Sequence, residues 1–216
     1  MSFRACAVIP VFDHEHALPL VVQALRQRAL PCVLVDDASS PACAQVMDEL
    51  ATQPDIHLLR LPVNQGKGGA VMAGLAEAQA YPDALICGYP QFDDSVPKGR
   101  LYARYLTHVW VWINSLSLEI RDSMCGFRVY PLAPTLAVIR AGGLGKRMDF
   151  DPEILVRLAW REQPMRWRPT RVHYPLDGRS HFRLWQDNVL ISRMHTRLFF
   201  GMLLRAPRLL WRRVRG

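Results

Sequence analysis

Zinc-binding cysteine spacing is missing from this sequence, and so is a long apolar run. The five cysteines are a scattered, odd-numbered set without a Cys-X-X-Cys pair, so we expect reduced, buried thiols rather than a zinc site or a disulfide framework. No run approaches the ~20 apolar residues of a membrane-spanning helix, and no secretory leader opens the chain. The sequence predicts a cytoplasmic protein whose 216 residues, 50% of them hydrophobic, can bury one core.

Acidic residues are missing from the C-terminal end, where arginine is frequent. None follows Asp187, although the whole chain carries 19 acidic residues against 27 basic ones. Apolar residues alternate with the arginines, which predicts a basic amphipathic helix at residues 181–216 that lies on an anionic membrane surface. An ordinary terminal helix packed on the domain is the alternative. No helix-turn-helix or RNA-binding signature accompanies the charge, so nucleic acid is not an expected partner.

Two short apolar runs near the start of the chain each end at polar residues. Residues 6–12 form the first, and residues 31–35 form the second, which leads directly into Asp36 and Asp37. Apolar residues recur at helical spacing over residues 17–25 between them. Strand, helix and strand in this order predict a parallel βαβ unit, whose ligands bind beyond the carboxyl ends of the strands. The two carboxylates are therefore candidates for ligand contact.

Strand and helix continue to alternate, which predicts α/β architecture. We expect a helix over residues 43–53, a strand over residues 56–63 and a helix over residues 71–80. The loop Asn64-Gln-Gly-Lys-Gly-Gly-Ala leads into the last of these. Amide groups at the start of that helix could face an anion, and Lys67 would add a positive charge beside them.

A further strand and a long helix are expected in the second half of the chain. The strand covers residues 81–88, and the helix begins near residue 102. The helix has one apolar face with 4-3-4-3 spacing, which we interpret as core rather than as a cofactor pocket. Its members are Tyr102, Leu106, Val109, Ile113 and Leu116.

A turn and a second acidic segment follow. The turn Arg121-Asp-Ser-Met-Cys-Gly-Phe-Arg leads into a strand, and a later helix is expected to run to about residue 160. Asp151 has the position of an N-cap for this helix, with Pro152 first in the helix and Glu153 in its first turn. Residues 164–176 are expected to be extended.

Four motifs occur in a characteristic order: Val-Ile-Pro-Val, Val-Asp-Asp-Ala-Ser-Ser, Asn-Gln-Gly-Lys-Gly-Gly-Ala and Asp-Ser-Met-Cys-Gly-Phe-Arg. Alone, the second could be an Asx-turn and the third tight backbone packing. Together they resemble family 2 glycosyltransferases of the GT-A fold, particularly the branch that contains polyprenyl-phosphate sugar synthases. The resemblance runs from about residue 5 to about residue 176. It implies a Rossmann-like, mostly parallel sheet flanked by helices, in a domain over residues 1–180 with the tail outside it.

The resemblance implies roles at the donor for residues of the first half. Pro10, Val11 and Asp37 would help to hold the base and ribose of a UDP- or GDP-sugar. Asp36 or Asp37 would accept hydrogen bonds from the nucleoside. Lys67 would lie near the phosphates, where positive charge offsets the leaving diphosphate.

On the acceptor side, the resemblance implies Asp122 as the first candidate for deprotonating or orienting the acceptor and Asp151 as the second. Arg128 would contact phosphate. Each has a simpler alternative: Asp122 as a turn cap, Arg128 as a surface strand residue, and Asp151 with Glu153 as helix-capping residues.

The chain departs from the family in one motif. Family members carry an Asp-X-Asp motif after the Gly-Lys-Gly loop, and its carboxylates hold Mn²⁺ or Mg²⁺ on the donor diphosphate. This chain continues from that loop as though the metal-binding strand near Ala80 were absent. Because hard divalent cations need oxygen ligands, Asp93 and Asp94 are the remaining candidates, with a solvated turn as the alternative. A metal-independent enzyme using Lys67, Arg100 and Arg128 is a further alternative.

The sequence thus predicts a glycosyltransferase that moves a sugar from a nucleoside diphosphate to a lipid-linked acceptor with inversion. It would be peripheral at the cytoplasmic face of the membrane, held there by the tail. The rival hypothesis is a catalytically impaired GT-A-like peripheral membrane protein that lost the metal-binding segment. A nucleotidyltransferase fits less well, because Pro10-Val-Phe-Asp-His is not a Gly-rich phosphate loop.

Overall fold

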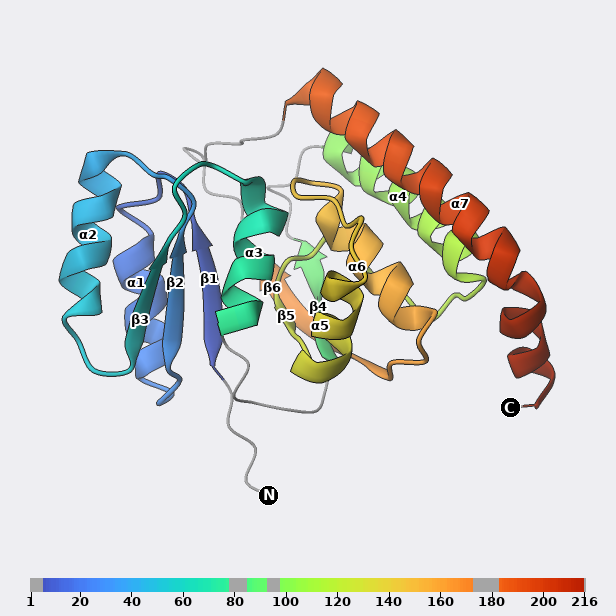
Figure 1. Ribbon diagram of the computed structural model, residues 1–216, viewed down its shortest axis with the longest axis horizontal. Coiled ribbons are helices and arrows are strands. Elements are labelled where there is room, and N and C mark those ends of the chain that lie inside the picture. Colours follow the sequence, from blue (N-terminus) through green and yellow to red (C-terminus); the bar gives the residue numbers. More distant parts are fainter. Residues whose placement is uncertain (1–5, 78–84, 93–97, 173–182, 216) are drawn as a thin grey trace. The chain divides into compact units, whose positions relative to one another are not determined.

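The computed structural model describes residues 6–77, 85–92, 98–172 and 183–215 (Figure 1). The chain divides into two compact units, residues 1–83 and residues 84–216, each with its own sheet. The sequence did not indicate a division at residue 83. The expected boundary after residue 180 stays a prediction.

The first unit is a three-stranded parallel sheet between helices (Figure 1). The sheet has the order β1-β2-β3, and its register pairs Val11 with Asp36 and Asp36 with Arg60. The predicted parallel α/β arrangement is confirmed here. The elements are β1 (Ala7–Val11), α1 (Leu18–Arg26), β2 (Cys32–Asp36), α2 (Pro41–Ala51), β3 (Ile56–Arg60) and α3 (Gly66–Glu77).

Alternate residues of β2 face opposite sides of the sheet, as the period of a strand requires. Leu34 packs in a core with residues of α1 and α2, whereas Val35 packs with Ala70 of α3. Every residue of β2 is buried. Because helices cover both faces of the central strand, its sequence is a continuous apolar run rather than an alternating one.

Helix α3 lies very close to the sheet. A Cβ atom at Gly74 would lie 2.3 Å from Cγ1 of Val8 and 2.7 Å from Cγ2 of Val35, so only glycine fits there without movement. The helix begins at Gly66, earlier than the predicted residue 71, so most of the Gly-rich segment is its first turn. Close packing on β1 and β2 explains why a glycine-rich segment is helical.

The second unit has a mixed three-stranded sheet with β4 in the middle. β4 pairs parallel with β6 and antiparallel with β5. The expected strand at the end of the turn is therefore present as a short edge strand. The elements are β4 (Leu85–Phe92), α4 (Lys98–Ser115), β5 (Arg128–Val129), α5 (Leu132–Arg140), α6 (Phe150–Ala159), β6 (Met165–Val172) and α7 (Leu184–Arg215).

The apolar face predicted for α4 is not core, and this expectation was wrong. Tyr102 and Leu106 are 72% and 65% exposed, and Val109 and Ile113 are also exposed. Because His108 lies against the buried carboxylate of Asp122 and Asn114 against His195 of α7, the buried face of α4 instead carries mostly polar residues. They are Thr107, His108, Val111, Asn114 and Ser115.

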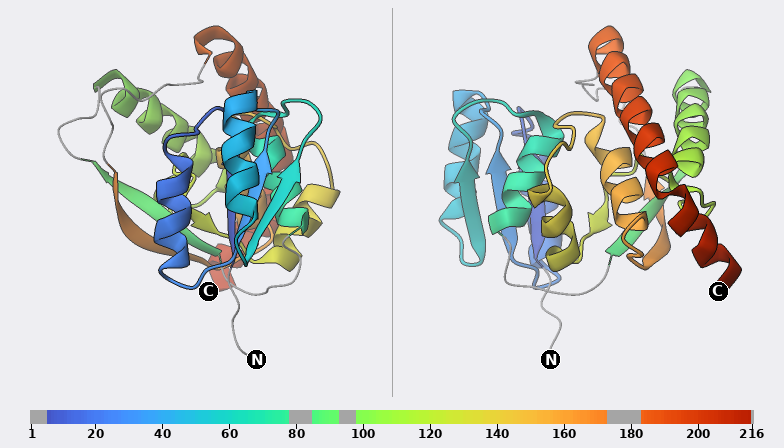
Figure 2. Two further views of the ribbon diagram at one scale, coloured as in Figure 1. Left: turned by 90° about the vertical axis from the view of Figure 1, so that its left-hand side faces the viewer. Right: turned by 45° about the vertical axis from the view of Figure 1, so that its right-hand side comes forward.

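The C-terminal segment is one helix of 32 residues, α7, with Pro207 inside it. It packs along α4 and also contacts α6, so Met194, Leu198 and Met202 are buried (Figure 2). The inner side of α7 is therefore that of an ordinary terminal helix packed on its domain, which was the alternative expectation. Within the ranges that the structure describes, no helix is both long enough and apolar enough to span a bilayer.

Candidate functional site

In the first unit, the two predicted carboxylates lie where β2 ends. Asp36 and Asp37 are only 4% and 3% exposed. The amide N–H of Ser39 donates to Oδ1 of Asp36 (2.9 Å), and Ala38 between them has a positive φ of 60°. The amide of Asp37 donates to the carbonyl of Val11 (2.9 Å). The Asp36 carboxylate therefore binds the amide three residues on, not two residues on as an Asx-turn requires, and β1 and β2 end side by side.

The carboxylate of Asp37 lies at the N-terminus of α3. The amide N–H of Gln65 donates to its Oδ1 (2.6 Å), and the Asn64 side chain donates to the carbonyl of Asp37 (3.1 Å). The amide of Gly66, whose φ is 78°, in turn donates to Oδ1 of Asn64 (3.1 Å). The sequence predicted an anion beside the amides at the start of this helix. The carboxylate of Asp37, from the chain itself, takes this place.

Asp36 faces a cation that sequence reasoning missed. Nε of Arg60 on β3 lies 3.4 Å from its Oδ2, and Arg60 also forms an ion pair with Asp48 (2.9 Å). The strand register, which pairs these two residues, brings the arginine to the same end of the sheet. Asp36 and Arg60 are the last residues of β2 and β3, so counting back along the two strands could have predicted that they lie opposite each other.

The other predicted donor residues lie at the same sheet edge. Pro10 and Val11 are the last residues of β1, and Val11 is buried. Lys67 is partly buried in the first turn of α3. Asp13 was missed: its Oδ1 accepts a hydrogen bond from the amide of Ser40 (2.7 Å). The structure thus brings all the predicted donor residues of the first unit together.

In the second unit, Asp122 is the centre of a buried polar cluster. The amides of Met124 and Cys125 donate to its Oδ1 (2.9 and 2.6 Å). Arg104 donates to its Oδ2 from Nε (2.6 Å), and Nε2 of His108 lies 3.4 Å from the same oxygen. Asp122 therefore caps the turn, as the simpler alternative expected. It also forms a salt bridge with Arg104 of α4.

These contacts determine the charge state of Asp122. Burial alone would raise its pKa, but the hydrogen bond from His108 and the charge and hydrogen bonds of Arg104 outweigh this effect. The amide of Cys125 acts in the same direction, so the pKa lies below its ordinary value of 3.8. A carboxylate held in this way is a weak base, and it is better suited to orienting or electrostatic work.

Arg128 connects this turn to α6. Its guanidinium donates to the carbonyls of Ser123 and Asp151 (both 2.8 Å), and it lies 3.6 Å from the Asp151 carboxylate. Because its side chain is 0% exposed, the alternative of a surface strand residue is wrong. Arg128 and Asp151 lie together, and their predicted roles at phosphate and acceptor stay predictions.

The start of α6 differs from the expected one. The helix begins at Phe150 with Asp149 as its N-cap residue, so Asp151 lies inside the first turn and not at the cap. Glu153 is completely buried and binds Arg157 (2.7 Å) and Arg197 (2.8 Å). The acidic segment therefore serves ion pairing more than capping.

An apolar pocket of about 500 Å³ lies between α4 and α7. Trp110, Phe199 and Phe200 are among its lining residues, together with His195. Asn114 lies 3.1 Å from Nδ1 of His195, and burial lowers the pKa of this histidine to about 4, so it is neutral near pH 7. Its buried Nε2 has no hydrogen-bond partner among the described residues.

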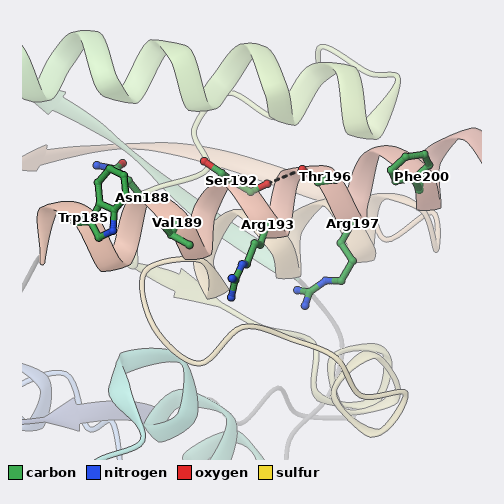
Figure 3. A pocket seen from close by; sticks show the side chains of 8 residues that line it. All are labelled: Trp185, Asn188, Val189, Ser192, Arg193, Thr196, Arg197 and Phe200. Carbon is green, nitrogen blue, oxygen red and sulfur yellow. Dashed lines mark hydrogen bonds between the residues drawn. The ribbon is translucent and has the colours of Figure 1, made fainter.

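A second, open groove of about 590 Å³ runs along α7 (Figure 3). Arg193 and Arg197 point to the same side of the helix, and Thr196 donates to the carbonyl of Ser192 (3.0 Å). The indole of Trp185 at one end is exposed. The groove therefore combines positive charge with aromatic surface, and none of the predicted site residues lines it.

The described residues do not fit a divalent metal. Among them, no group of three or more His, Cys, Asp or Glu side chains is placed to hold one. Asp36 and Asp37 are engaged with Arg60 and with main-chain amides. Asp93 and Asp94, the predicted substitutes, lie outside the described residues.

Comparison with known sequences confirms the family resemblance. Residues 6–103 match the model of "Glycosyl transferase family 2". A region of 79 residues is 37% identical to the undecaprenyl-phosphate 4-deoxy-4-formamido-L-arabinose transferase of Pectobacterium carotovorum, and covers 33% of this chain. A region of 86 residues is 34% identical to the transferase of the same name from Photorhabdus laumondii, and covers 34% of this chain.

The chain spans about a quarter of the length of these relatives, 24% and 26% respectively. The family match includes β1 to α3, where the predicted donor residues lie, and ends within α4. Asp122, Arg128 and Asp151 lie beyond it. The two regions of the predicted site therefore differ in how directly the family match supports them.

Proposed function

We propose that this protein is a glycosyltransferase that moves a sugar from a nucleoside diphosphate donor to a lipid-linked acceptor. The observation that carries the proposal is the carboxylate pair at the end of β2, beside the N-terminus of α3, within the segment that matches the family. The names of the relatives, which are undecaprenyl-phosphate sugar transferases, support the lipid-linked acceptor.

The donor would bind at the edge of the first unit's sheet. Pro10 and Val11 would contact the base, and Asp36 and Asp37 would accept hydrogen bonds from base N–H or ribose hydroxyl groups. UDP and GDP both offer such donors. Lys67 would lie toward the phosphates and offset the charge of the leaving diphosphate.

The acceptor chemistry would be a single displacement with inversion. An acceptor oxygen attacks the anomeric carbon, the bond from that carbon to the diphosphate breaks, and the diphosphate leaves. A phosphate acceptor is already an anion, so no strong base is needed. The low pKa of Asp122 agrees with this, because Asp122 would then orient groups rather than remove a proton. Arg128 and Asp151 would support the same turn.

The protein would act at the cytoplasmic face of a membrane. Support comes from apolar side chains on the outer sides of two helices: Leu106 of α4 is 65% exposed, and Leu204 of α7 is 84% exposed. Interleaved arginines on α7 suit an anionic lipid surface. The apolar pocket between α4 and α7, with its volume of about 500 Å³, would take part of a hydrocarbon chain.

A second candidate function is a catalytically impaired protein that keeps the fold and binds the membrane. The described residues give it some support, since they form no metal-binding cluster and Asp37 is bound to Gln65. Under this alternative, membrane binding would not depend on the carboxylates at the end of β2.

Calorimetric titration with UDP, GDP and their sugar conjugates tests the donor site, with and without Mn²⁺. The variant Asp37→Asn keeps the acceptor oxygen for the amide of Gln65 but loses the charge. Glu49→Ala, an exposed carboxylate of α2, is the matched control. We expect binding by the parent and the control, and weakening of about tenfold in Asp37→Asn. No binding by the parent under any condition would leave only the impaired protein.

A further inference from the structure

Five arginines line a pocket of the second unit, and none of the predicted site residues is among its lining residues. The pocket has a volume of about 450 Å³ and lies among α5, the end of α6 and the C-terminal half of α7. Of the residues that the structure describes, Glu153 is the one acidic residue in its lining. The arginines are Arg157, Arg161, Arg197, Arg205 and Arg208.

Glu153 accounts for two of these cations. Arg157 donates to its Oε1 (2.7 Å), and Arg197 donates to both of its oxygens (2.9 and 2.8 Å). Arg157 also donates to the carbonyls of Gly142 and Gly143 (2.7 and 3.0 Å), but its buried Nε has no partner among the described residues. Even here, two guanidinium groups face one carboxylate.

The other three arginines add positive charge, and no buried carboxylate of the described part of the chain forms an ion pair with them. Arg205 lies over the ring of Trp160, 4.7 Å from its centroid, and donates to the carbonyl of Gly201 (2.9 Å). The ion pair of Arg208 with Glu162 is 3.6 Å long and joins two exposed side chains, so it neutralises little. Arg161 follows the last turn of α6. The pocket therefore has a clear excess of positive charge.

The position of Arg205 is fixed by close helix packing. A Cβ atom at Gly201 would lie 2.8 Å from Cη2 of Trp160, so glycine lets α7 approach the indole. The indole is held in turn by a hydrogen bond from its Nε1 to the carbonyl of Asn114 (2.9 Å). The guanidinium of Arg205 thus rests on a rigid aromatic surface, which reduces the entropy lost when it binds a ligand.

We propose that this arginine pocket binds a phosphate-bearing anion. Guanidinium groups match phosphate oxygens with paired hydrogen bonds, and a pocket limits the screening that weakens exposed charges. The phosphate can belong to the headgroup of an anionic phospholipid or to a soluble compound. Leu204, Leu210 and Trp211 are exposed on the same stretch of α7, which favours the headgroup.

Two titrations of the full chain test this. One uses inorganic pyrophosphate at low salt, and the other compares phosphatidylglycerol–phosphatidylcholine vesicles with vesicles of phosphatidylcholine alone. The double variant Arg161→Gln/Arg205→Gln removes two pocket cations but leaves the ion pairs of Glu153. The matched control, Arg140→Gln/Arg193→Gln, removes two exposed arginines that do not line the pocket.

We expect the pocket variant to lose affinity for at least one of the two probes by about tenfold, while the control changes much less. Loss for mixed vesicles alone identifies a lipid headgroup, and loss for pyrophosphate alone identifies a soluble phosphate compound. Equal losses in both double variants would show general surface charge and overturn the proposal. A parent that binds pyrophosphate weakly or not at all, and has no preference for the anionic vesicles, would also overturn it.

Two further measurements keep the result independent of folding and of sugar transfer. Arg205→Lys keeps the charge but not the planar fork, so it should lose part of the affinity while its circular dichroism matches the parent. If the double variant does not fold, Arg161→Gln against Arg140→Gln carries the same comparison. UDP binding by the same samples should be unchanged, so failure of this proposal leaves the proposed function standing.

Discussion

The two units hold their buried carboxylates in different ways. In the first unit, the carboxylates of Asp36 and Asp37 accept hydrogen bonds from main-chain amides a few residues away or at the start of α3, and one arginine, the half-exposed Arg60, faces Asp36 at 3.4 Å. In the second, Arg157 of the same helix and Arg197 of α7 bind Glu153, and Arg104 of α4 binds Asp122 in addition to two main-chain amides. A main-chain amide carries no net charge. An arginine carries a full positive charge, and leaving that charge buried without an ionic partner is costly.

This difference indicates which carboxylates are needed for folding and which are available for ligand work. A carboxylate bound by amides can exchange one of them for a ligand group at modest cost. A buried carboxylate that neutralises two arginines cannot be removed without leaving unpaired charge. The second unit should therefore be the one whose stability depends on individual carboxylates, and substitutions can break or sharpen that contrast.

The largest effect is expected for Glu153→Gln. It leaves Arg157 and Arg197 beside a neutral amide that is completely buried, so the free energy of unfolding should fall by about 3–5 kcal/mol. Urea denaturation followed by circular dichroism measures this. The exposed Glu119 provides the control, and Glu119→Gln should change stability by less than about 0.5 kcal/mol. Similar losses in both variants would show that the stability of the second unit does not depend on this buried carboxylate in particular.

Acid should destabilise the second unit through His195. Its folded pKa is about 4, below the ordinary 6.5, so the unfolded chain binds the proton more tightly. This contribution to stability is complete above pH 6.5 and is lost as the pH falls toward 4, by up to about 3 kcal/mol. The groups facing it, Asn114 and Trp110, are neutral. In His195→Leu the stability should depend less on pH over this range; an unchanged slope would assign the dependence to other groups.

A smaller effect is expected in the first unit for Gly74→Ala. The added methyl group would overlap Val8 and Val35, which should lower stability by about 1–3 kcal/mol despite the better helix propensity of alanine. Adding Val8→Ala to this variant should restore part of the loss by making room. If the double variant loses more stability than the two single variants lose together, the close approach of α3 is not the reason for the glycine.

The smallest effect is expected for Arg208→Gln. Its ion pair with Glu162 joins two exposed side chains, so stability should change by less than about 1 kcal/mol. Comparison with Glu153→Gln in the same denaturation experiment then spans the range from exposed to buried ion pairs within one unit. A loss as large as that of Glu153→Gln would mean that exposure does not decide the strength of these pairs.

The first unit could be predicted closely from the sequence because its signals are local. The expected strands over residues 6–12, 31–35 and 56–63 are found at Ala7–Val11, Cys32–Asp36 and Ile56–Arg60. Short apolar runs that stop at Asp or Asn identify them, and the same stops place the donor candidates at one edge. The start of α3 was placed too late, because glycine propensity was weighed without the packing that overrides it.

The second unit was harder because its signals come from partners far apart in the chain. The 4-3-4-3 face of α4 indicated core, yet the buried side is the one on which Asn114 meets His195, 81 residues away. Arg197 similarly meets Glu153 across 44 residues. No local pattern shows which of two helix faces will find such a partner. The placement of Arg128 inside the protein depended on Asp151 in the same way.

The position of β4 in the middle of its sheet has a consequence for synthesis on the ribosome. All the strands and helices of the first unit come from one short stretch of chain, so this unit can fold as soon as it emerges. β4 must wait for β6, which comes after three helices, and α4 must wait for α7 at the end. A chain that stalls late would thus present a folded first unit joined to an unfolded second unit, and proteases and chaperones would act on the unfolded part first.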